Sequence, residues 1–194
     1  GKYVVLEYER HYDDVDESHW AYQAIRAMSA KHILQGVSAE SFDPAGTLTR
    51  AQLVTLVVRA AGLKPQGSAS GAFEDVPDDA WFADAVGAAY AAGLVQGKTA
   101  TSFAPDDPVS REEAAVILVR TLILVTGWTP PAEGDGFLDE EQINDWALEA
   151  VKQAQAAGLL RGRGDGTFDP GAFMTRAEGA QLIKNLLDIL SSMG

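Results

Sequence analysis

The sequence lacks cysteine and is poor in basic residues: 15 Lys and Arg stand against 28 Asp and Glu, a formal net charge of −13. The absence of cysteine excludes a disulfide scaffold, a thiolate zinc site and a cysteine nucleophile. The excess of acid disfavours nucleic acid and anionic membranes as partners, because phosphates are bound by positive surfaces. No apolar run approaches the roughly 18 residues of a spanning helix, so we expect no membrane insertion. The chain can still bury a core, since 46% of its 194 residues are hydrophobic.

Three segments of the chain repeat one template of Trp, Gly, Phe, Pro and Arg with identical internal spacing. These anchors are Trp20, Gly36, Phe42, Pro44 and Arg50, then Trp81, Gly97, Phe103, Pro105 and Arg111, then Trp146, Gly162, Phe168, Pro170 and Arg176. Connectors rich in Gly, Pro and small polar residues separate the copies. We predict three repeats, over residues 13–66, 67–131 and 132–194, in one compact body. Residues 1–12 are predicted to be an N-terminal extension with a short strand, or the remnant of a preceding domain.

Each repeat is predicted to form a helix, a loop and a second helix. Ser18, Asp79 and Asn144 lie two residues before the Trp, where a side-chain oxygen can cap the first helix. The Trp and the alanines after it form an apolar stripe at helical spacing. A hydroxyl residue and a Gln or Glu three positions later form a capping box for the second helix.

We therefore expect a mainly α fold. One helical hairpin of about 60 residues buries its surface poorly alone. Hence the three helix-loop-helix repeats are predicted to pack as a monomeric pseudo-threefold trimer, around a central bundle of the three second helices.

The arginine that opens each second helix, Arg50, Arg111 or Arg176, needs an explanation. A cation at the first helical position faces the positive end of the helix dipole, yet it occurs three times. One interpretation is an anion site, in which free helix amides and the guanidinium hold a carboxylate. The alternative is a pairing with an internal carboxylate, for which the candidates are Asp14, Asp75 and Asp139.

The other repeated residues allow two interpretations each. The glycines at 36, 97 and 162 provide a positive φ or a close backbone approach, in a bare turn or at a ligand. The tryptophans at 20, 81 and 146 are core residues by default, or platforms for a sugar ring. In the third repeat Arg161 and Arg163 add two cations to the loop, which makes a pocket there the most attractive to anions, unless the loop is simply solvated.

Nothing in the sequence indicates catalysis. The three histidines lie near the first repeat and lack metal-ligand spacing, and residues 165–169 lack the spaced oxygens of a calcium loop, so we predict no metal and no cofactor. Paired carboxylates are adjacent in sequence and have no nucleophile or histidine beside them. We therefore expect no catalytic residues and no enzyme.

The repeated order of Asp-Val, Trp, a Gly loop, Phe-x-Pro and Thr-Arg-Ala-Glu resembles the S-layer homology domain, which occurs as tandem triplets on bacterial surface proteins. The resemblance covers residues 12–192, and the four-residue motif is intact at 175–178. Gln52 replaces the Glu in the first repeat, and the second has Ser110-Arg111-Glu112-Glu113. The third repeat departs by one extra residue between Asp139 and Trp146.

The resemblance implies a pseudo-trimer whose inter-repeat grooves bind a secondary cell-wall polysaccharide linked to peptidoglycan, through a terminal pyruvylated N-acetylmannosamine. Such binding anchors a protein to the Gram-positive wall, at the cell surface or in an S-layer. The residues implied are the arginines for the ketal carboxylate, the glycines as groove lining, and supporting Trp and Asp side chains: Arg50, Arg111, Arg176, Gly36, Gly97, Gly162, Trp20, Trp81, Trp146, Asp14 and Asp75.

Two functions remain open at this point. The first is a carbohydrate-binding anchor, which we expect at the C-terminus of a longer secreted protein. The second is a protein-interaction or S-layer lattice scaffold that binds no glycan, in which the arginines are structural.

Overall fold

The computed structural model describes residues 10–65 and 71–194; most of the predicted N-terminal extension, with its strand, and part of the first connector lie outside these residues. The described residues form six α-helices and one 3-10 turn, with isolated bridges as their only β-pairing. The elements are α1 (Tyr22–Ala30), α2 (Arg50–Ala60), α3 (Ala83–Ala91), α4 (Arg111–Thr126), η1 (Glu140–Gln142), α5 (Asp145–Ala156) and α6 (Arg176–Met193). The prediction of a mainly α fold is confirmed. No helix among the described residues is long and apolar enough to cross a membrane.

The second helices of the repeats, α2, α4 and α6, begin where the sequence predicts. Their N-caps Thr49, Ser110 and Thr175 each accept a hydrogen bond from the backbone N–H three residues later, and each capping box is complete. Local chemistry alone fixes these helix starts, because both partners of the box lie within one turn.

The predicted caps of the first helices are wrong in detail. α1 and α3 begin after Ala21 and Phe82, neither of which caps with its side chain, so Ser18 and Asp79 lie outside the helices. Instead, the backbone N–H and the hydroxyl of Ser18 both donate hydrogen bonds to Asp16 Oδ1 in a preceding turn. Asn144 does stand at the N-cap of α5, yet its side-chain amide donates to Glu112 Oε1 of α4 at 2.6 Å. The side chain of Asn144 therefore bonds to the neighbouring helix and does not cap its own.

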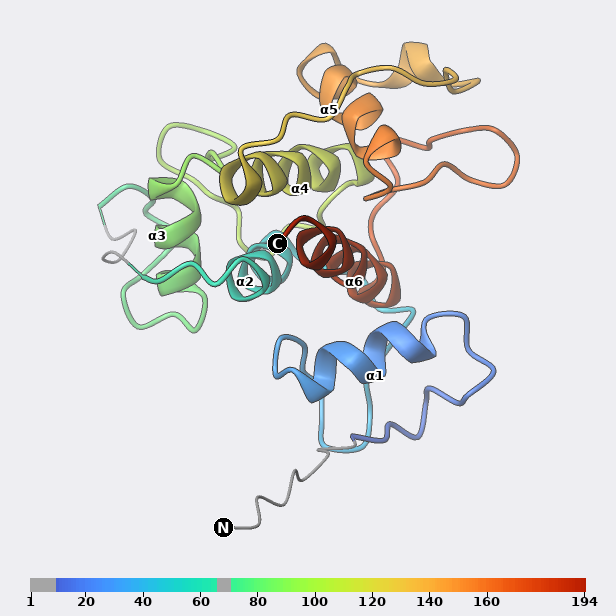
Figure 1. Cartoon of the computed structure of the whole chain (residues 1–194). Coiled ribbons are helices and arrows are strands. Elements are labelled where there is room, and N and C mark those ends of the chain that lie inside the picture. The colour runs from blue at the N-terminus through green and yellow to red at the C-terminus, as the bar shows by residue number, and fades with distance from the viewer. Residues whose placement is uncertain (1–9, 66–70) are drawn as a thin grey trace.

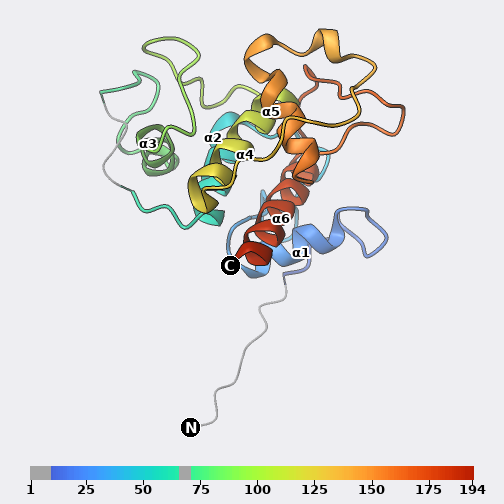
Figure 2. The same cartoon turned by 45° about the horizontal axis from the view of Figure 1, so that its top comes forward.

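The helices pack between repeats, whereas the sequence suggested a hairpin within each repeat. α1 packs on α6, α3 on α2 and α5 on α4. Each first helix therefore lies against the second helix of the preceding repeat, and the first repeat lies against the third, as both views show (Figures 1 and 2). The two helices of one repeat do not form a close pair among the described residues.

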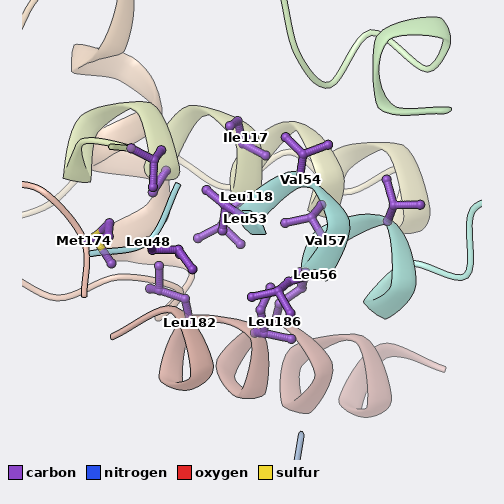
Figure 3. Packing of buried hydrophobic residues seen from close by; sticks show 14 of the residues in the cluster. Leu48, Leu53, Val54, Leu56, Val57, Ile117, Leu118, Met174, Leu182 and Leu186 are labelled. Carbon is purple, nitrogen blue, oxygen red and sulfur yellow. The ribbon is translucent and has the colours of Figure 1, made fainter. Parts of the chain in front are cut away.

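The core lies where α2, α4 and α6 meet, because these three helices contact one another pairwise. Leu53, Leu118 and Leu186 are completely buried between them (Figure 3). The helix α4 is apolar on nearly all sides, since it is covered by α5 as well as by α2 and α6. Toward the C-terminal end of α4 this apolar surface becomes accessible, and Val125 is exposed.

The segments before the second helices form a closed ring of backbone hydrogen bonds. Leu48 N donates to Met174 O at 2.8 Å, Met174 N to Val109 O at 2.9 Å, and Val109 N to Leu48 O at 3.0 Å. The side chains of all three residues are buried. Each repeat thus contributes one donor and one acceptor, and the ring joins the first repeat to the last.

Candidate functional site

The arginines at the starts of the second helices reach into the loop of the following repeat. Nε donates to the carbonyl of the repeat's Phe, and Nη2 to the carbonyl of the residue before its Gly. The pairs are Arg50 with Phe103 (3.0 Å) and Gln96 (3.0 Å), Arg111 with Phe168 (2.7 Å) and Arg161 (2.8 Å), and Arg176 with Phe42 (2.9 Å) and Gln35 (2.8 Å). These carbonyls supply the negative partners that the unfavourable helix position requires.

The same guanidinium groups cover the buried Phe rings. The distance from the guanidinium carbon Cζ to the ring centre is 4.7 Å for Arg50 on Phe103, 4.9 Å for Arg111 on Phe168 and 4.7 Å for Arg176 on Phe42. Because the arginine residues are only 4 to 7% exposed, these cation–π contacts are largely desolvated, which strengthens them.

The helix amides predicted to be free are occupied. The backbone N–H groups of Arg111 and Glu112 donate to Ala172 O at 2.9 Å and Pro170 O at 3.1 Å, in the loop of the third repeat. The other two second helices make equivalent bonds to the next repeat, and the third N–H bonds to the capping hydroxyl. A ligand in this region would therefore meet arginine nitrogens rather than helix amides.

The predicted carboxylates Asp14 and Asp75, and Asp139 with them, hold the loops and do not pair with the arginines. Asp14 accepts from the N–H groups of Phe42 and Asp43 at 2.8 and 2.7 Å. Asp75 and Asp139 do the same in their own repeats. The turn η1 takes up the extra residue of the third repeat, so Asp139 reaches its place.

These bonds also set the acidity of two of the carboxylates. Burial raises the pKa of Asp14 and Asp75, but the hydrogen bonds from the loop amides and from Ser41 or Ser102 outweigh it, so each pKa lies below its ordinary value. The loops are thus held by carboxylates that remain charged.

The loop glycines allow a close approach, which was one of their two predicted roles. A Cβ at Gly36 would lie 2.5 Å from the ring of Tyr12 and 2.6 Å from two backbone carbonyls, and Gly97 is enclosed in the same way by Phe73. Gly162 is confined by Phe137 and by Thr167 O. Their φ angles are not positive.

The aromatic residues beside these glycines were missed in the sequence. Tyr12 lies in the predicted extension, yet it is buried and packs on Phe42 with ring centres 5.4 Å apart. Phe73 packs on Phe103 in the same way, with ring centres 5.6 Å apart. A signal was present, because an aromatic residue stands two positions before each loop-holding Asp.

Three grooves lie beside the arginines, and each is lined by all three repeats. The first groove, of about 230 Å³, has Arg176, loop residues 34–37 and Trp81. The second, of about 420 Å³, has Arg50, residues 94–98 and Trp146. The third, of about 340 Å³, has Arg111, residues 158–161 and Trp20. An arginine of one repeat, the loop and second helix of the next, and a tryptophan of the remaining one thus meet at one site.

The three tryptophans are not core residues, so the default interpretation is wrong. Trp20, Trp81 and Trp146 are 61%, 65% and 59% exposed. They stand at the edge of the first helices, which places small alanines in the core and leaves the indole over the groove of a neighbouring repeat. An exposed indole can contact the apolar face of a ligand ring, while the buried guanidinium beside it can bind an anionic group on that ring.

Residues 11–54, 72–115 and 136–180 each match the S-layer homology domain. The chain belongs to the S-layer homology family.

The curated relatives of this S-layer homology chain are much longer proteins. It is 32% identical to an amylopullulanase of Thermoanaerobacterium thermosulfurigenes, over 97% of the chain and 10% of the relative. It is 33% identical to an endoglucanase of Bacillus sp. (strain KSM-635), over 91% and 18%, and 31% identical to a surface-layer 125 kDa protein of Lysinibacillus sphaericus, over 88% and 14%. The chain therefore spans less than a fifth of each of these proteins.

Most of the predicted site residues of this S-layer homology chain line one of the three grooves. The arginines, glycines and tryptophans line the grooves, except that Gly162 lies outside the set that lines the third. In the third loop, Arg161 lines its groove, whereas Arg163 is held by Asp169 at 3.2 Å and Glu178 at 3.1 Å. Half of the predicted extra charge is thus already paired.

Proposed function

We propose that this chain anchors a larger protein to the bacterial cell wall by binding a secondary cell-wall polysaccharide in its grooves. Its place is outside the cell, at the cell surface. The relatives are named for different roles, as an amylopullulanase, an endoglucanase and a surface-layer protein, yet they share this module. A segment common to such different proteins is expected to serve attachment, and the described residues contain no cluster of His, Asp or Glu suited to a metal.

One observation carries the proposal: each groove combines a buried arginine with an exposed tryptophan from another repeat. A guanidinium binds a carboxylate through paired, charge-assisted hydrogen bonds. An indole covers the apolar face of a sugar ring. The ligand that fits both is a sugar bearing a carboxylate, and we propose a terminal pyruvylated N-acetylmannosamine.

The local charge of the grooves supports this ligand. The whole chain carries −13, so an anionic polymer is repelled by most of the surface. Cations gather in the grooves instead, Arg59 and Arg176 in the first and Arg111 and Arg161 in the third. An anionic sugar would therefore bind at these places and not elsewhere. Occupation of more than one groove by one polymer would add avidity.

A protein-interaction or S-layer lattice scaffold without glycan binding is the second candidate. The hydrogen bonds of the arginines favour it, because they give these residues a structural role whether or not a sugar binds. For the same reason, an Arg→Ala variant cannot separate the two functions, since it would weaken the fold under either of them.

Substitution of the exposed tryptophans separates the two functions. We expect calorimetric titration of the chain with pyruvylated N-acetylmannosamine to show binding, and titration with the same sugar lacking pyruvate to show none. The triple variant Trp20→Ala, Trp81→Ala and Trp146→Ala should lose binding while the melting temperature stays within about 3 °C. Trp128→Ala is the matched control, because Trp128 is exposed but lies outside the three grooves.

One result would contradict the anchor, and another would contradict the proposed recognition of the carboxylate. If the unaltered chain binds neither sugar, the scaffold becomes the better proposal. If it binds both sugars equally, the arginines do not recognise the carboxylate of the pyruvate group.

We also propose that the repeats 13–66, 67–131 and 132–194 are related by a pseudo-threefold axis within a monomer. The cyclic order of arginine contacts and backbone bonds supports this symmetry. Sedimentation at several concentrations should give the monomer mass of 20.6 kDa. A mass that rises with concentration would contradict the monomer.

A further inference from the structure

The three grooves differ at the third residue of the second helix, which is Gln52, Glu113 or Glu178. In each, one side-chain oxygen accepts the N–H of the capping residue: Thr49 N to Gln52 Oε1 at 3.0 Å, Ser110 N to Glu113 Oε2 at 2.9 Å, and Thr175 N to Glu178 Oε2 at 3.1 Å. A carboxylate then retains a second acceptor oxygen, whereas an amide retains only a donor. The two Glu residues can therefore bind a cation that Gln52 cannot.

In the second groove, the second carboxylate oxygen of Glu113 accepts a hydrogen bond from the groove's own arginine. Glu113 Oε1 accepts from Arg50 Nη1 at 2.9 Å, which is the nitrogen left over by the two loop carbonyls. Lys98 Nζ lies 4.0 Å from the same oxygen and 3.1 Å from Asp107, so it does not draw the carboxylate away. An internal carboxylate thus occupies the position at which a ligand carboxylate would bind.

In the third groove, another residue holds the spare oxygen. Glu178 Oε1 accepts from Arg163 Nη1 at 3.1 Å, and Arg163 stands at the position of Lys98. Arg111 forms no ion pair with any carboxylate in the described part of the chain and donates only to the two loop carbonyls. Its Nη1 is left for a ligand.

In the first groove, none of the described lining residues carries a carboxylate. Arg176 is 7% exposed, donates to Phe42 O and Gln35 O, and makes no ion pair with the residues that the structure describes. Among the described lining residues, Arg59 is the only other charged one, and it donates to Ile33 O at 3.2 Å. Val37 stands at the position of Lys98 and Arg163. No cation is needed at this position, because Gln52 has no carboxylate that must be held away from Arg176.

We propose that the first and third grooves accept the anionic group of the sugar and that Glu113 closes the second. The residue at the third helical position selects which grooves bind, and Arg163 is a positioning residue that keeps Glu178 off Arg111. This inference rests on the proposed function, because it assumes that an anionic sugar is the ligand.

The tryptophans allow each groove to be observed separately. The chain has four, one in each groove and Trp128 outside them. The four indole N–H signals of the ¹⁵N-labelled chain are to be assigned by single Trp→Phe variants and followed by NMR while pyruvylated N-acetylmannosamine is added. We expect the signals of Trp81 and Trp20 to shift with saturation, and those of Trp146 and Trp128 to stay in place.

Two reciprocal substitutions test the mechanism. Glu113→Gln should make the Trp146 signal titrate, with affinity raised about tenfold to a hundredfold, because a charge-assisted hydrogen bond no longer competes. Gln52→Glu should weaken binding at Trp81 by the same order. Each substitution introduces a residue that the chain already uses at the equivalent position, so the capping box is retained and the melting temperature serves as the control.

The role of Arg163 is tested in the third groove. Arg163→Val copies the residue of the first repeat and should weaken binding at Trp20 by releasing Glu178 toward Arg111. Adding Glu178→Gln to that variant should restore binding, which a merely structural role of Arg163 would not produce.

The outcomes separate the two levels of the proposal. If the Trp146 signal titrates with the same midpoint as the other two, the closure of the second groove is refuted while the anchor function stands. If Glu113→Gln and Gln52→Glu leave all midpoints unchanged, the selecting role of this position is refuted. If no groove signal shifts at any concentration, the anchor function itself fails.

Discussion

Replacement of Arg111 by alanine should destabilise the whole chain by about 3–5 kcal/mol. The side chain makes two charge-assisted hydrogen bonds, at 2.7 Å to Phe168 O and 2.8 Å to Arg161 O, and covers the Phe168 ring. Each such bond is worth about 1.5–3 kcal/mol and the ring contact about 1 kcal/mol. Part of this is offset by the desolvation of the guanidinium, which also lowers the pKa of Arg111.

The loss is large relative to the total stability of a domain, which is about 5–15 kcal/mol. Urea unfolding followed by circular dichroism should therefore show a lower midpoint, and calorimetry a fall in melting temperature of about 10 °C. Arg111→Lys should cost less than the alanine variant, because it keeps the charge but lacks the planar fork that reaches both carbonyls. It provides a measurement if the alanine variant does not fold.

Arg120 on the same helix is the matched control. It is exposed, and its contact with Leu94 O is long, at 3.5 Å. Arg120→Ala should change the free energy of unfolding by less than about 0.5 kcal/mol. A loss below 1 kcal/mol for Arg111→Ala would refute the argument, since the arginines could then not be what ties each loop to the neighbouring repeat.

Three further predictions concern the loops. Gly97→Ala should destabilise the chain by about 1–3 kcal/mol in urea unfolding, because the new methyl group would meet Ser102 O and the Phe73 ring at 2.7 and 2.5 Å; an unchanged midpoint would contradict the close approach. Ala104→Gly should stabilise the chain by about 1 kcal/mol, measured as a higher melting temperature, because Ala104 has a φ of 59°, which strains alanine but not glycine; a lower melting temperature would contradict this. Because the pKa values of Asp14 and Asp75 are lowered in the folded chain, their charged forms stabilise the fold above the unfolded pKa, near 3.8, and this stabilisation is lost as pH falls through the folded pKa. Asp75→Asn should therefore flatten the dependence of the free energy of unfolding on pH below pH 4. An unaltered slope would contradict this role of Asp75.

The sequence predicted the features that short-range chemistry decides. The capping boxes at Thr49, Ser110 and Thr175 involve residues three positions apart, so the starts of the second helices followed directly. The resemblance to the S-layer homology domain, and not the spacing by itself, implied that arginines, glycines and tryptophans line grooves between repeats.

The features that were missed depend on contacts between repeats. Arg50 and Phe103 are 53 positions apart, and Arg176 and Phe42 are 134 apart, so no pattern within one repeat identifies the loop carbonyl as the partner. The exposure of Trp81 was mispredicted for the same reason, because its helix packs on α2 of the preceding repeat rather than on its own second helix. Ser18 failed as a cap because a local Asp competes for its hydroxyl.

The closed ring of Leu48, Met174 and Val109 limits how this architecture can change in evolution. A solenoid has two open ends, so a repeat can be added or deleted at either end and the remainder keeps its contacts. Here the donor and acceptor of each repeat are both used, and the last repeat returns to the first. A fourth unit would find no unpaired edge to join, and the loss of one unit would expose two. We therefore expect these repeats to be gained and lost as sets of three.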